Sequence, residues 1–342
     1  MLSGHGCKIA PSGYYAAKKR PPAKRSLREA EVLPHIVRVH SSRSQGRHNY
    51  GARKVWVELG KEQQRGEHVG LGAVPRCQVE RLMKAHCWRG RRRGRQFITT
   101  RPDSKADRLP DRVEPKFEAS RPNQLWVVDF TYVSTWAGMA FTAFVIDVYS
   151  RRIVGWRVAG RMPRALPLDA LEMALWTRAQ TDQLVDGLIH HRDAGSQYTA
   201  LMYTDRLVEA GALASIGTVG DSYDNALAES TIGLYKTEMV WPEGPWRDVN
   251  HLELATADHV WWFNNRRIHS GIDYDTPIEH EQKYYRWVAS VGDEAESHVC
   301  ELARLATGTY RRSGLSGLVH EPEERPTQMD QRRVHRIGEF QQ

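Results

Sequence analysis

The sequence predicts an α/β protein in which a mixed sheet flanked by helices follows a small all-α module. Three observations predict this class. The net charge changes sign along the chain, a proline-rich segment separates two regions, and the second region alternates apolar β-branched runs with amphipathic stretches. The chain has 342 residues, of which 40% are hydrophobic, enough for two domains that each bury a core.

The charge is distributed very unevenly. Residues 1–120 carry 27 Lys and Arg against 11 Asp and Glu, a net charge of +16, whereas residues 121–342 carry 22 against 30, a net charge of −8. A basic first third joined to an acidic remainder indicates a polyanion-binding module attached to a second unit. A solvated basic surface or a poorly ordered arm would give the same asymmetry, so the charge alone leaves both interpretations open.

Several classes of protein are excluded or disfavoured by composition. No apolar run approaches the ~20 residues of a bilayer helix, and the first 15 residues lack the apolar segment of a secretory signal. The four cysteines are too few and too scattered for a disulfide framework. We therefore expect a cytoplasmic protein without a membrane partner.

The chain divides by composition into five segments. The segment before the α/β unit contains Pro102, Pro110 and Pro115 among alternating charges, which is typical of a linker. The expected segments are a basic lead-in over residues 1–25, a helical module over 26–98, a linker over 99–121, an α/β unit over 122–288 and an irregular tail over 289–342.

The helical module is expected to contain three short helices. Ser26 with Glu29 three residues later predicts a capping box at the start of the first helix. The apolar spacing predicts the other two over Ala52–Leu59 and Gln78–His86. Three short helices followed by the arginine-rich run Arg89–Arg95 resemble a helix-turn-helix module that binds nucleic acid. A small helical bundle with an incidental basic tail is the alternative.

The α/β unit is predicted element by element from apolar periodicity. Two of its strands are joined by the short polar turn Tyr149–Arg152, which predicts an antiparallel hairpin. The expected order is strands Leu125–Val133, Met139–Val148 and Ile153–Ala159, helix Leu166–Ala179, strand Gly187–His191, helix Ala200–Ala210, strand Ala212–Ile216, helix Asn225–Val240 and a mainly helical stretch Trp241–Arg267.

Three carboxylates lie at positions that suggest a functional role. Asp129 lies within a strand on the same face as Val127 and Val133, so its charge needs a cation, hydrogen-bond donors or a proton. Asp193 follows the carboxyl end of a strand, the edge of a sheet where ligands collect. Glu229 falls on the first or second turn of a helix.

Oxygen ligands from three carboxylates suit Mg²⁺ or Mn²⁺ rather than zinc. Such a set can hold two ions ~3.5–4 Å apart, an arrangement suited to phosphodiester chemistry. Taken singly, each acid is more often structural, and Asp147, Asp205 and Asp221 compete for the same role; we rank them below the trio.

Several segments carry a resemblance to a known family. The strings QLWVVDFTYV, FVIDVYSRRIVGW, GLIHHRDAGSQYT, VGDSYDNALAES, GLYKTE and WWFNNRRIHSGI resemble the integrase catalytic core of bacterial transposases, specifically the second reading frame of the insertion sequence 3 family. Residues 194–228 separate Asp193 from Glu229 by 35 residues, the spacing of that family's Asp-Asp-35-Glu triad. CKIAPSGYYA, YGARKVW and CQVERLM resemble the family's helix-turn-helix segment.

The resemblance implies an RNase H-like core and a DNA transposase that cleaves and joins phosphodiester bonds at the ends of an insertion element. It implies Asp129, Asp193 and Glu229 as ligands of two Mg²⁺ ions, with Mn²⁺ as a possible substitute, and Lys236 as a phosphate contact. It also implies double-stranded DNA as the partner, a homo-oligomer on DNA, a first-frame partner protein and a location at the bacterial nucleoid.

The remaining expected DNA contacts come mainly from the basic segment, where phosphate contacts dominate affinity. Surface solvation is the alternative for each of these side chains. A catalytically decayed or repurposed DNA-binding protein remains the alternative function for the chain, and an RNase H-type ribonuclease is a third. The candidates besides Lys236 are Asn225, Arg53, Lys54, Arg81, Lys84, Arg91, Arg92 and Arg93.

Overall fold

The structure is a computed structural model. It describes residues 10–67, 70–92, 119–160, 166–181, 183, 185–192, 201–216 and 226–291. The chain divides into a unit of residues 1–286 and a second unit of residues 287–342. Most of the expected linker and tail, together with Arg93, Asp193, Asp221 and Asn225, lies outside the described residues.

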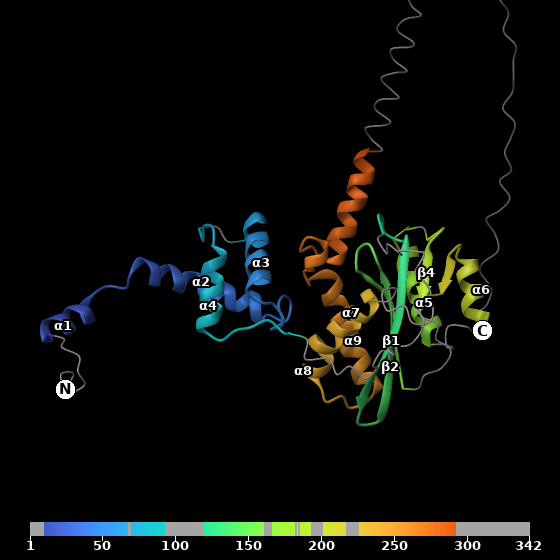
Figure 1. Ribbon diagram of the computed structural model, residues 1–342, viewed down its shortest axis with the longest axis horizontal. Helices are drawn as coiled ribbons and strands as arrows, with labels where there is room; N and C mark the ends of the chain where they lie inside the picture. The colour runs from blue at the N-terminus through green and yellow to red at the C-terminus, as the bar shows by residue number, and fades with distance from the viewer. Residues whose placement is uncertain are drawn as a thin grey trace, which may run out of the picture. The chain divides into compact units, whose positions relative to one another are not determined.

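Four helices precede the sheet (Figure 1). They are α1 Pro11–Lys19, α2 Lys24–Ser41, α3 Ala52–Gln64 and α4 Arg76–Ala85. The first of them lies inside the expected lead-in, so helical structure begins earlier than the composition indicated. Val79, Leu82 and Met83 of α4 are buried in a cluster that also contains Ile36 of α2 and Val55 of α3.

The capping box predicted at Ser26 is wrong. The N-cap of α2 is Ala23, three residues before Ser26, and no side chain caps the helix. Pro21 and Pro22 hold the preceding backbone extended, so the helix begins as soon as these prolines end. Glu29 instead accepts hydrogen bonds from Arg25 at 2.8 Å and from Arg81 at 2.6 Å.

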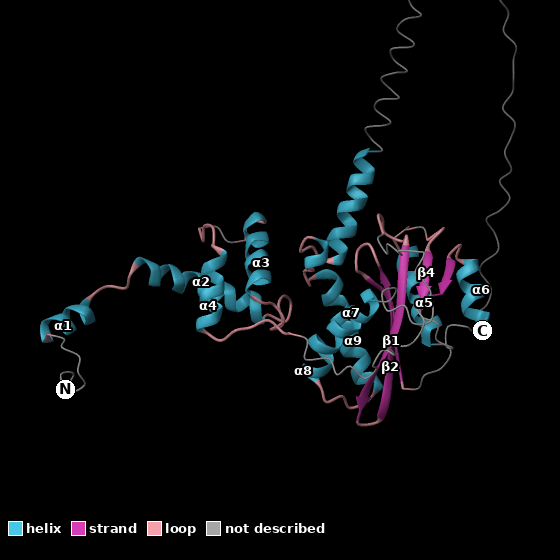
Figure 2. Ribbon diagram, viewed as in Figure 1, coloured by secondary structure: helices cyan, strands magenta, loops and turns pink. Residues whose placement is uncertain are grey.

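A five-stranded mixed sheet forms the centre of the α/β unit (Figure 2). The first three strands pair antiparallel, while the fourth and fifth run parallel to the first, in the spatial order β3-β2-β1-β4-β5. This confirms the predicted mixed sheet and its hairpin. The strands are β1 Leu125–Thr135, β2 Gly138–Asp147, β3 Ile153–Ala159, β4 Ile189–Arg192 and β5 Leu213–Ile216.

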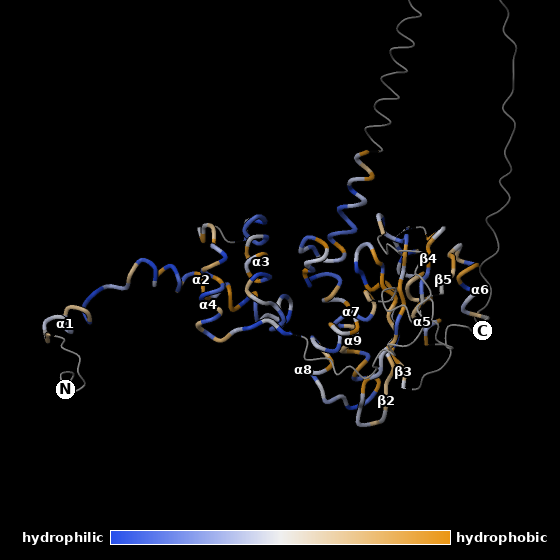
Figure 3. The backbone as a smooth tube through the Cα atoms, in the orientation of Figure 1, coloured by the Kyte–Doolittle hydropathy of each residue, from blue (hydrophilic) through white to orange (hydrophobic). Residues whose placement is uncertain are grey.

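Helices cover both faces of this sheet because its central strands alternate between two apolar cores. Trp126 and Val128 of β1 pack with α5 Leu166–Ala179 and α6 Leu201–Glu209. Val127 and Val133 face the opposite core, which includes residues of α7 Ala226–Tyr235 and α9 Val249–Asn265. Figure 3 shows many apolar residues along the strands of the sheet.

The close approach of α5 to the sheet depends on a glycine. A Cβ atom at Gly155 of β3 would lie 2.1 Å from the backbone oxygen of Ala170 and 2.8 Å from the Cβ of Ala174. Any side chain at this position would therefore push α5 away from β3.

The helix predicted over Asn225–Val240 changes its winding partway along. α7 ends at Tyr235 and continues as a π-helical turn, η3 Lys236–Val240, and a short α8 Trp241–Glu243. A cis peptide joins Gly244 to Pro245, and the next residue, Trp246, accepts a backbone hydrogen bond from Trp136 at 2.9 Å. This segment is thereby fastened beside the end of β1.

Residues 277–291 form a further helix. Among the helices that the structure describes, none combines the length and apolar character needed to cross a membrane.

Candidate active site

Asp129 lies on β1, on the face predicted from its alternation with Val127 and Val133. The side chain is half-buried, and its Oδ1 accepts a hydrogen bond from the backbone N–H of Phe130 at 2.7 Å. A backbone donor stabilises the ionised carboxylate at a position between the apolar core and solvent.

The end of β4 lies beside Asp129. The parallel register pairs Arg192, the last residue of β4, with Val128, the residue before Asp129. Asp193 follows Arg192 directly in the sequence and lies outside the described residues. The structure therefore describes both strands, β1 and β4, that lead to Asp129 and Asp193, but of these two acids it describes only Asp129.

Glu229 occupies the first turn of α7, a helix that packs against β1. The side chain is exposed, and the positive end of the helix dipole favours its charge. The helix thus carries an acidic side chain on the side of the sheet to which Asp129 belongs.

Lys236 begins the π-helical turn seven residues after Glu229. Its Nζ lies 5.1 Å from the centroid of the Tyr132 ring. Burial lowers the pKa of the Lys236 ammonium, and the negative charge of Asp129 opposes this shift. A cation here is therefore within electrostatic reach of the candidate catalytic carboxylate.

A buried ion pair that the sequence did not reveal holds η3 in place. Arg267, which follows α9, donates from Nε and Nη2 to Glu238 of η3 at 2.7 and 2.8 Å. Burial opposes ionisation of Glu238, but the charge of Arg267 outweighs it and lowers the pKa. Its only signal in the sequence was a glutamate directly before the apolar residues Met239, Val240 and Trp241, and nothing local pointed to its partner 29 residues away.

The two described acids fit a hard divalent cation by their donor chemistry. Asp129 and Glu229 offer carboxylate oxygens only, the ligands that Mg²⁺ and Mn²⁺ take. Within the described ranges no group of three His, Cys, Asp or Glu side chains is arranged to hold a metal ion. The third expected donor, Asp193, lies outside those ranges.

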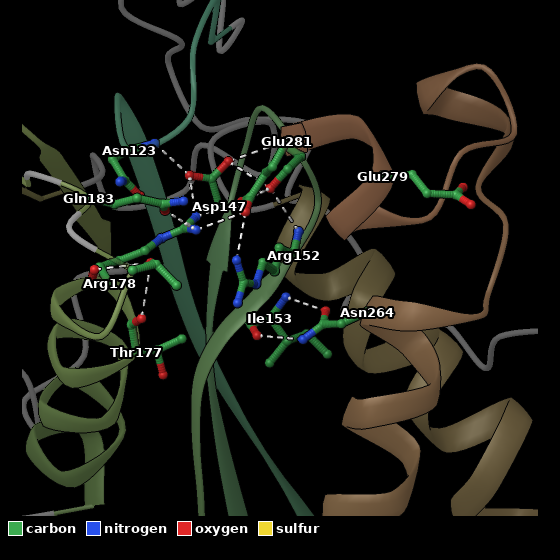
Figure 4. Close-up of polar contacts among 12 residues, drawn as sticks. Asn123, Asp147, Arg152, Ile153, Thr177, Arg178, Gln183, Asn264, Glu279 and Glu281 are labelled. Atoms are coloured by element: carbon green, nitrogen blue, oxygen red, sulfur yellow. Dashed lines mark hydrogen bonds and ion pairs between the residues drawn. The ribbon is translucent and has the colours of Figure 1, made fainter. Parts of the chain in front are cut away.

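The competing acid Asp147 belongs to a buried network (Figure 4). Its Oδ2 accepts from the backbone N–H of Asn123 at 2.7 Å and from Arg178 at 3.3 Å, and its Oδ1 accepts from the Ser150 hydroxyl at 3.0 Å. With its side chain fully buried and surrounded by protein donors, Asp147 is structural. Asp205 is exposed on α6, and Asp221 lies outside the described residues.

The same network joins the sheet to Glu281, on the part of the helix of residues 277–291 that belongs to the first unit. Arg178 of α5 also donates to Glu281 at 2.6 Å, and Arg152 donates to Glu281 at 2.7 Å. Burial alone would raise the pKa of Glu281, but the two arginines outweigh it and lower that pKa. Burial raises the pKa of Asp147 in spite of Arg178.

The candidate DNA contacts differ in how free their charges are. Lys84 and Arg92 are exposed. Arg91 donates to the Asn49 side chain at 3.2 Å, and Arg81 pairs with Glu29.

Two further candidates contact aromatic rings. The Arg53 guanidinium lies 5.3 Å from the Tyr274 ring, and Lys54 Nζ lies 5.2 Å from the Tyr50 ring. Burial, reinforced by Arg267, lowers the pKa of Lys54 to about 7. All these residues stay predicted DNA contacts, and Lys84 and Arg92 present the freest charges among those described.

The fold and the site define a class of protein. A mixed sheet of this order, with an acid on β1 and another on the first turn of α7, forms an RNase H-like core of the integrase type. Residues 119–222 match a family model described as Integrase core domain, and residues 211–277 match a second model of the same description.

Two relatives extend the match along most of the chain. The chain is 49% identical over 278 residues to a Mycobacterium tuberculosis protein named as a transposase for insertion sequence element IS986/IS6110, covering 81% of this chain and 96% of that protein. It is 45% identical over 291 residues to the transposase for insertion sequence element IS629 of Shigella sonnei, covering 84% and 91%.

The chain also matches a solved structure, the HTLV-2 integrase catalytic core domain in complex with magnesium, with 16% sequence identity and a TM-score of 0.36. The match covers 48% of this chain and 99% of the HTLV-2 chain.

The chain belongs to the insertion sequence 3 family of transposases. It is a DNA transposase, and the activity of its class is polynucleotidyl transfer. The chain is similar to a transposase over four-fifths of its length, and this does not favour the alternative of a decayed DNA-binding protein.

Proposed function

We propose that Asp129, Asp193 and Glu229 act together as the catalytic carboxylates of this transposase and hold two Mg²⁺ ions. The observation that carries the proposal is the register of β1 and β4, because it pairs Val128 with Arg192 and so aligns the residues before Asp129 and Asp193. The exposed Glu229 on α7, which packs against β1, supports the same site. Two bound Mg²⁺ ions would supply charge stabilisation at the attacking and leaving oxygens of a phosphodiester.

The residues of the chain have separate tasks in this scheme. The three carboxylates provide the oxygen ligands, and the backbone N–H of Phe130 donates a hydrogen bond to Asp129. Lys236 contacts a phosphate of the DNA end, and the Glu238–Arg267 pair holds the turn on which Lys236 lies. Water first and a DNA 3′-hydroxyl later act as nucleophiles, so no covalent protein–DNA bond is needed.

The substrate of the reaction is double-stranded DNA at the ends of the insertion element and at the target. The basic residues 1–120, with a net charge of +16, deliver this polyanion to the acidic core. We propose that the chain works as a homo-oligomer on DNA, because two element ends have to be processed together, and that a first-frame protein is a further partner.

The test is a cleavage and strand-transfer assay on DNA that carries the element's terminal sequences. Asp129→Asn, Asp193→Asn and Glu229→Gln should each lower Mg²⁺-dependent cleavage by at least about a thousandfold while DNA binding stays within about twofold, because each variant removes one ligand charge. Asp205→Asn is the matched control, since Asp205 is exposed on α6.

Removing the metal gives a second arm of the same assay. A chelator should abolish cleavage by the unmodified chain, and added Mg²⁺ or Mn²⁺ should restore it. Cleavage by Asp129→Asn at the rate of Asp205→Asn would overturn the assignment of the carboxylates. DNA binding without cleavage by the unmodified chain would favour the repurposed DNA-binding protein instead.

A further inference from the structure

A cleft with aromatic walls opens beside Lys236. It measures about 560 Å³ and lies between the end of β1 and the segment that runs from η3 to Trp246. Small-molecule sites typically measure about 300–1,000 Å³, so the cleft has room for a nucleotide.

Two walls of the cleft are aromatic side chains that remain largely in solvent. Tyr132 is 60% exposed and Trp241 is 64% exposed, although both carry large apolar rings. Trp246, by contrast, is 3% exposed, and its Nε1 donates to the backbone oxygen of Val240 at 3.0 Å, so it forms a fixed wall. The exposed rings of Tyr132 and Trp241 are therefore available to a ligand.

The charge in the cleft is positive and lies close to one of these rings. Lys236 Nζ is 5.1 Å from the centroid of Tyr132. A flat aromatic surface next to an ammonium group is the combination that proteins use for unpaired nucleotides, because the ring stacks on the base and the cation contacts the phosphate.

The cleft adjoins the candidate catalytic site. Val133, which also lines the cleft, follows Asp129 by four residues on the same face of β1, about 13 Å at the rise of a strand, whereas alternation turns the Tyr132 side chain to the other face. The charge of Asp129 also acts on Lys236. Bases in an intact duplex are stacked on their neighbours, so these rings reach a base only after it has left the stack.

We propose that this cleft binds one unpaired nucleotide of the DNA end, with its base in contact with both Trp241 and Tyr132 and its phosphate against Lys236. The proposal rests on the proposed function, because it places the nucleotide next to the bond that is cut. It adds that the DNA end is opened locally before cleavage and that the protein stabilises the opened form.

A rescue experiment tests the proposal. Cleavage is measured on a fully paired element end and on the same end with its terminal nucleotides mismatched. Trp241→Ala and Tyr132→Ala should each slow cleavage of the paired end by about fivefold to a hundredfold, the range that stacking on one ring contributes, and should cleave the mismatched end within about threefold of the unmodified chain.

Trp136→Ala is the matched control. Trp136 is 76% exposed and follows β1 directly, but it does not line the cleft. The control should cleave both ends at the rate of the unmodified chain. Equal losses on paired and mismatched ends, or losses for Trp136→Ala as large as for Trp241→Ala, would overturn the proposal.

A photocrosslink provides a readout that does not depend on cleavage. 5-Iodouracil is placed at the terminal nucleotide of the DNA, bound to the full chain carrying Asp129→Asn, and the crosslinked peptide is mapped by mass spectrometry. Attachment at Tyr132 or Trp241 supports the proposal, and attachment elsewhere contradicts it. If the proposed function itself fails, the unmodified chain cuts neither the paired nor the mismatched end, a result distinct from either outcome.

Discussion

At the scale of single residues, burial decides what each charged side chain can do. Asp147 and Asp129 belong to neighbouring strands and looked alike as acids within apolar runs. The first is fully buried and saturated by donors, whereas the second is half-buried at the place where β4 ends. Only Asp129 keeps the access that a ligand or substrate requires.

His259 of α9 provides a test of burial at this scale. The ring is 1% exposed among aromatic neighbours, and burial lowers its pKa from 6.5 to about 4. Below pH 6.5 the unfolded chain takes up a proton at this ring that the folded chain does not. The free energy of unfolding should therefore fall by about 3 kcal/mol as the pH decreases from about 6.5 to 4.

This prediction is checked by urea unfolding at several pH values with His259→Phe. The variant keeps an aromatic ring but cannot be protonated, so its stability should depend less steeply on pH between 6.5 and 4. The exposed His251 serves as the control, and His251→Gln should retain the pH dependence of the unmodified chain. Identical curves for the unmodified chain and His259→Phe would contradict the prediction.

At the scale of elements, the predicted boundaries agree best where apolar periodicity is strong. The strand Ile153–Ala159 and the helix Leu166–Ala179 begin and end where expected. The single helix expected over Asn225–Val240 instead becomes π-helical at Lys236. Local sequence did not indicate this change, because the turn is held by the distant Arg267 through Glu238.

The network around Arg178 gives a prediction for how elements are joined. Arg178 is fully buried between Asp147 and Glu281, so Arg178→Met leaves two buried carboxylates without their cation. We expect the free energy of unfolding to fall by about 3–5 kcal/mol in urea titrations. Arg157→Met is the control, because Arg157 is about half exposed and its pairs with Asp169 and Glu253 lie at the surface.

The control variant should lose less than about 1 kcal/mol, as surface ion pairs do. A loss for Arg178→Met no larger than that of Arg157→Met would show that the network does not stabilise the attachment of Glu281 to the sheet.

At the scale of the whole molecule, the basic and acidic regions are joined by specific contacts. The Tyr50 hydroxyl donates to the backbone oxygen of Arg266 at 3.1 Å and accepts from the N–H of Ile268 at 3.0 Å. Lys61 pairs with Glu279 at 3.0 Å. Part of the positive charge in the first third of the chain is thus used within the protein rather than offered to DNA.

The salt dependence of DNA binding should reveal which charges remain available. Lys84 and Arg92 are exposed, so the double variant Lys84→Ala/Arg92→Ala should reduce the slope of log affinity against log salt by about 2, close to 0.9 for each phosphate that is no longer neutralised. Lys61→Ala should change the slope little, because Lys61 is engaged by Asp275 and Glu279. Fluorescence anisotropy over a salt series measures both slopes, and equal changes would refute this division of charges.

The sequence by itself determined the order of the elements, the mixed sheet, the helical module and the family. These features depend on apolar periodicity, turn residues and short motifs, which are local properties of the chain. It also singled out Asp129, Asp193 and Glu229 as a set, through their spacing and their places on strands and a helix.

Only the tertiary structure decided which side chains pair with one another and which remain exposed to solvent. Asp147 pairs with Arg178, Glu238 pairs with Arg267, and Tyr132 and Trp241, which are far apart in the sequence, line one cleft. Such pairings depend on how helices and strands pack against one another. Because burial and electrostatics act between neighbours in space, no local pattern in the sequence specifies them.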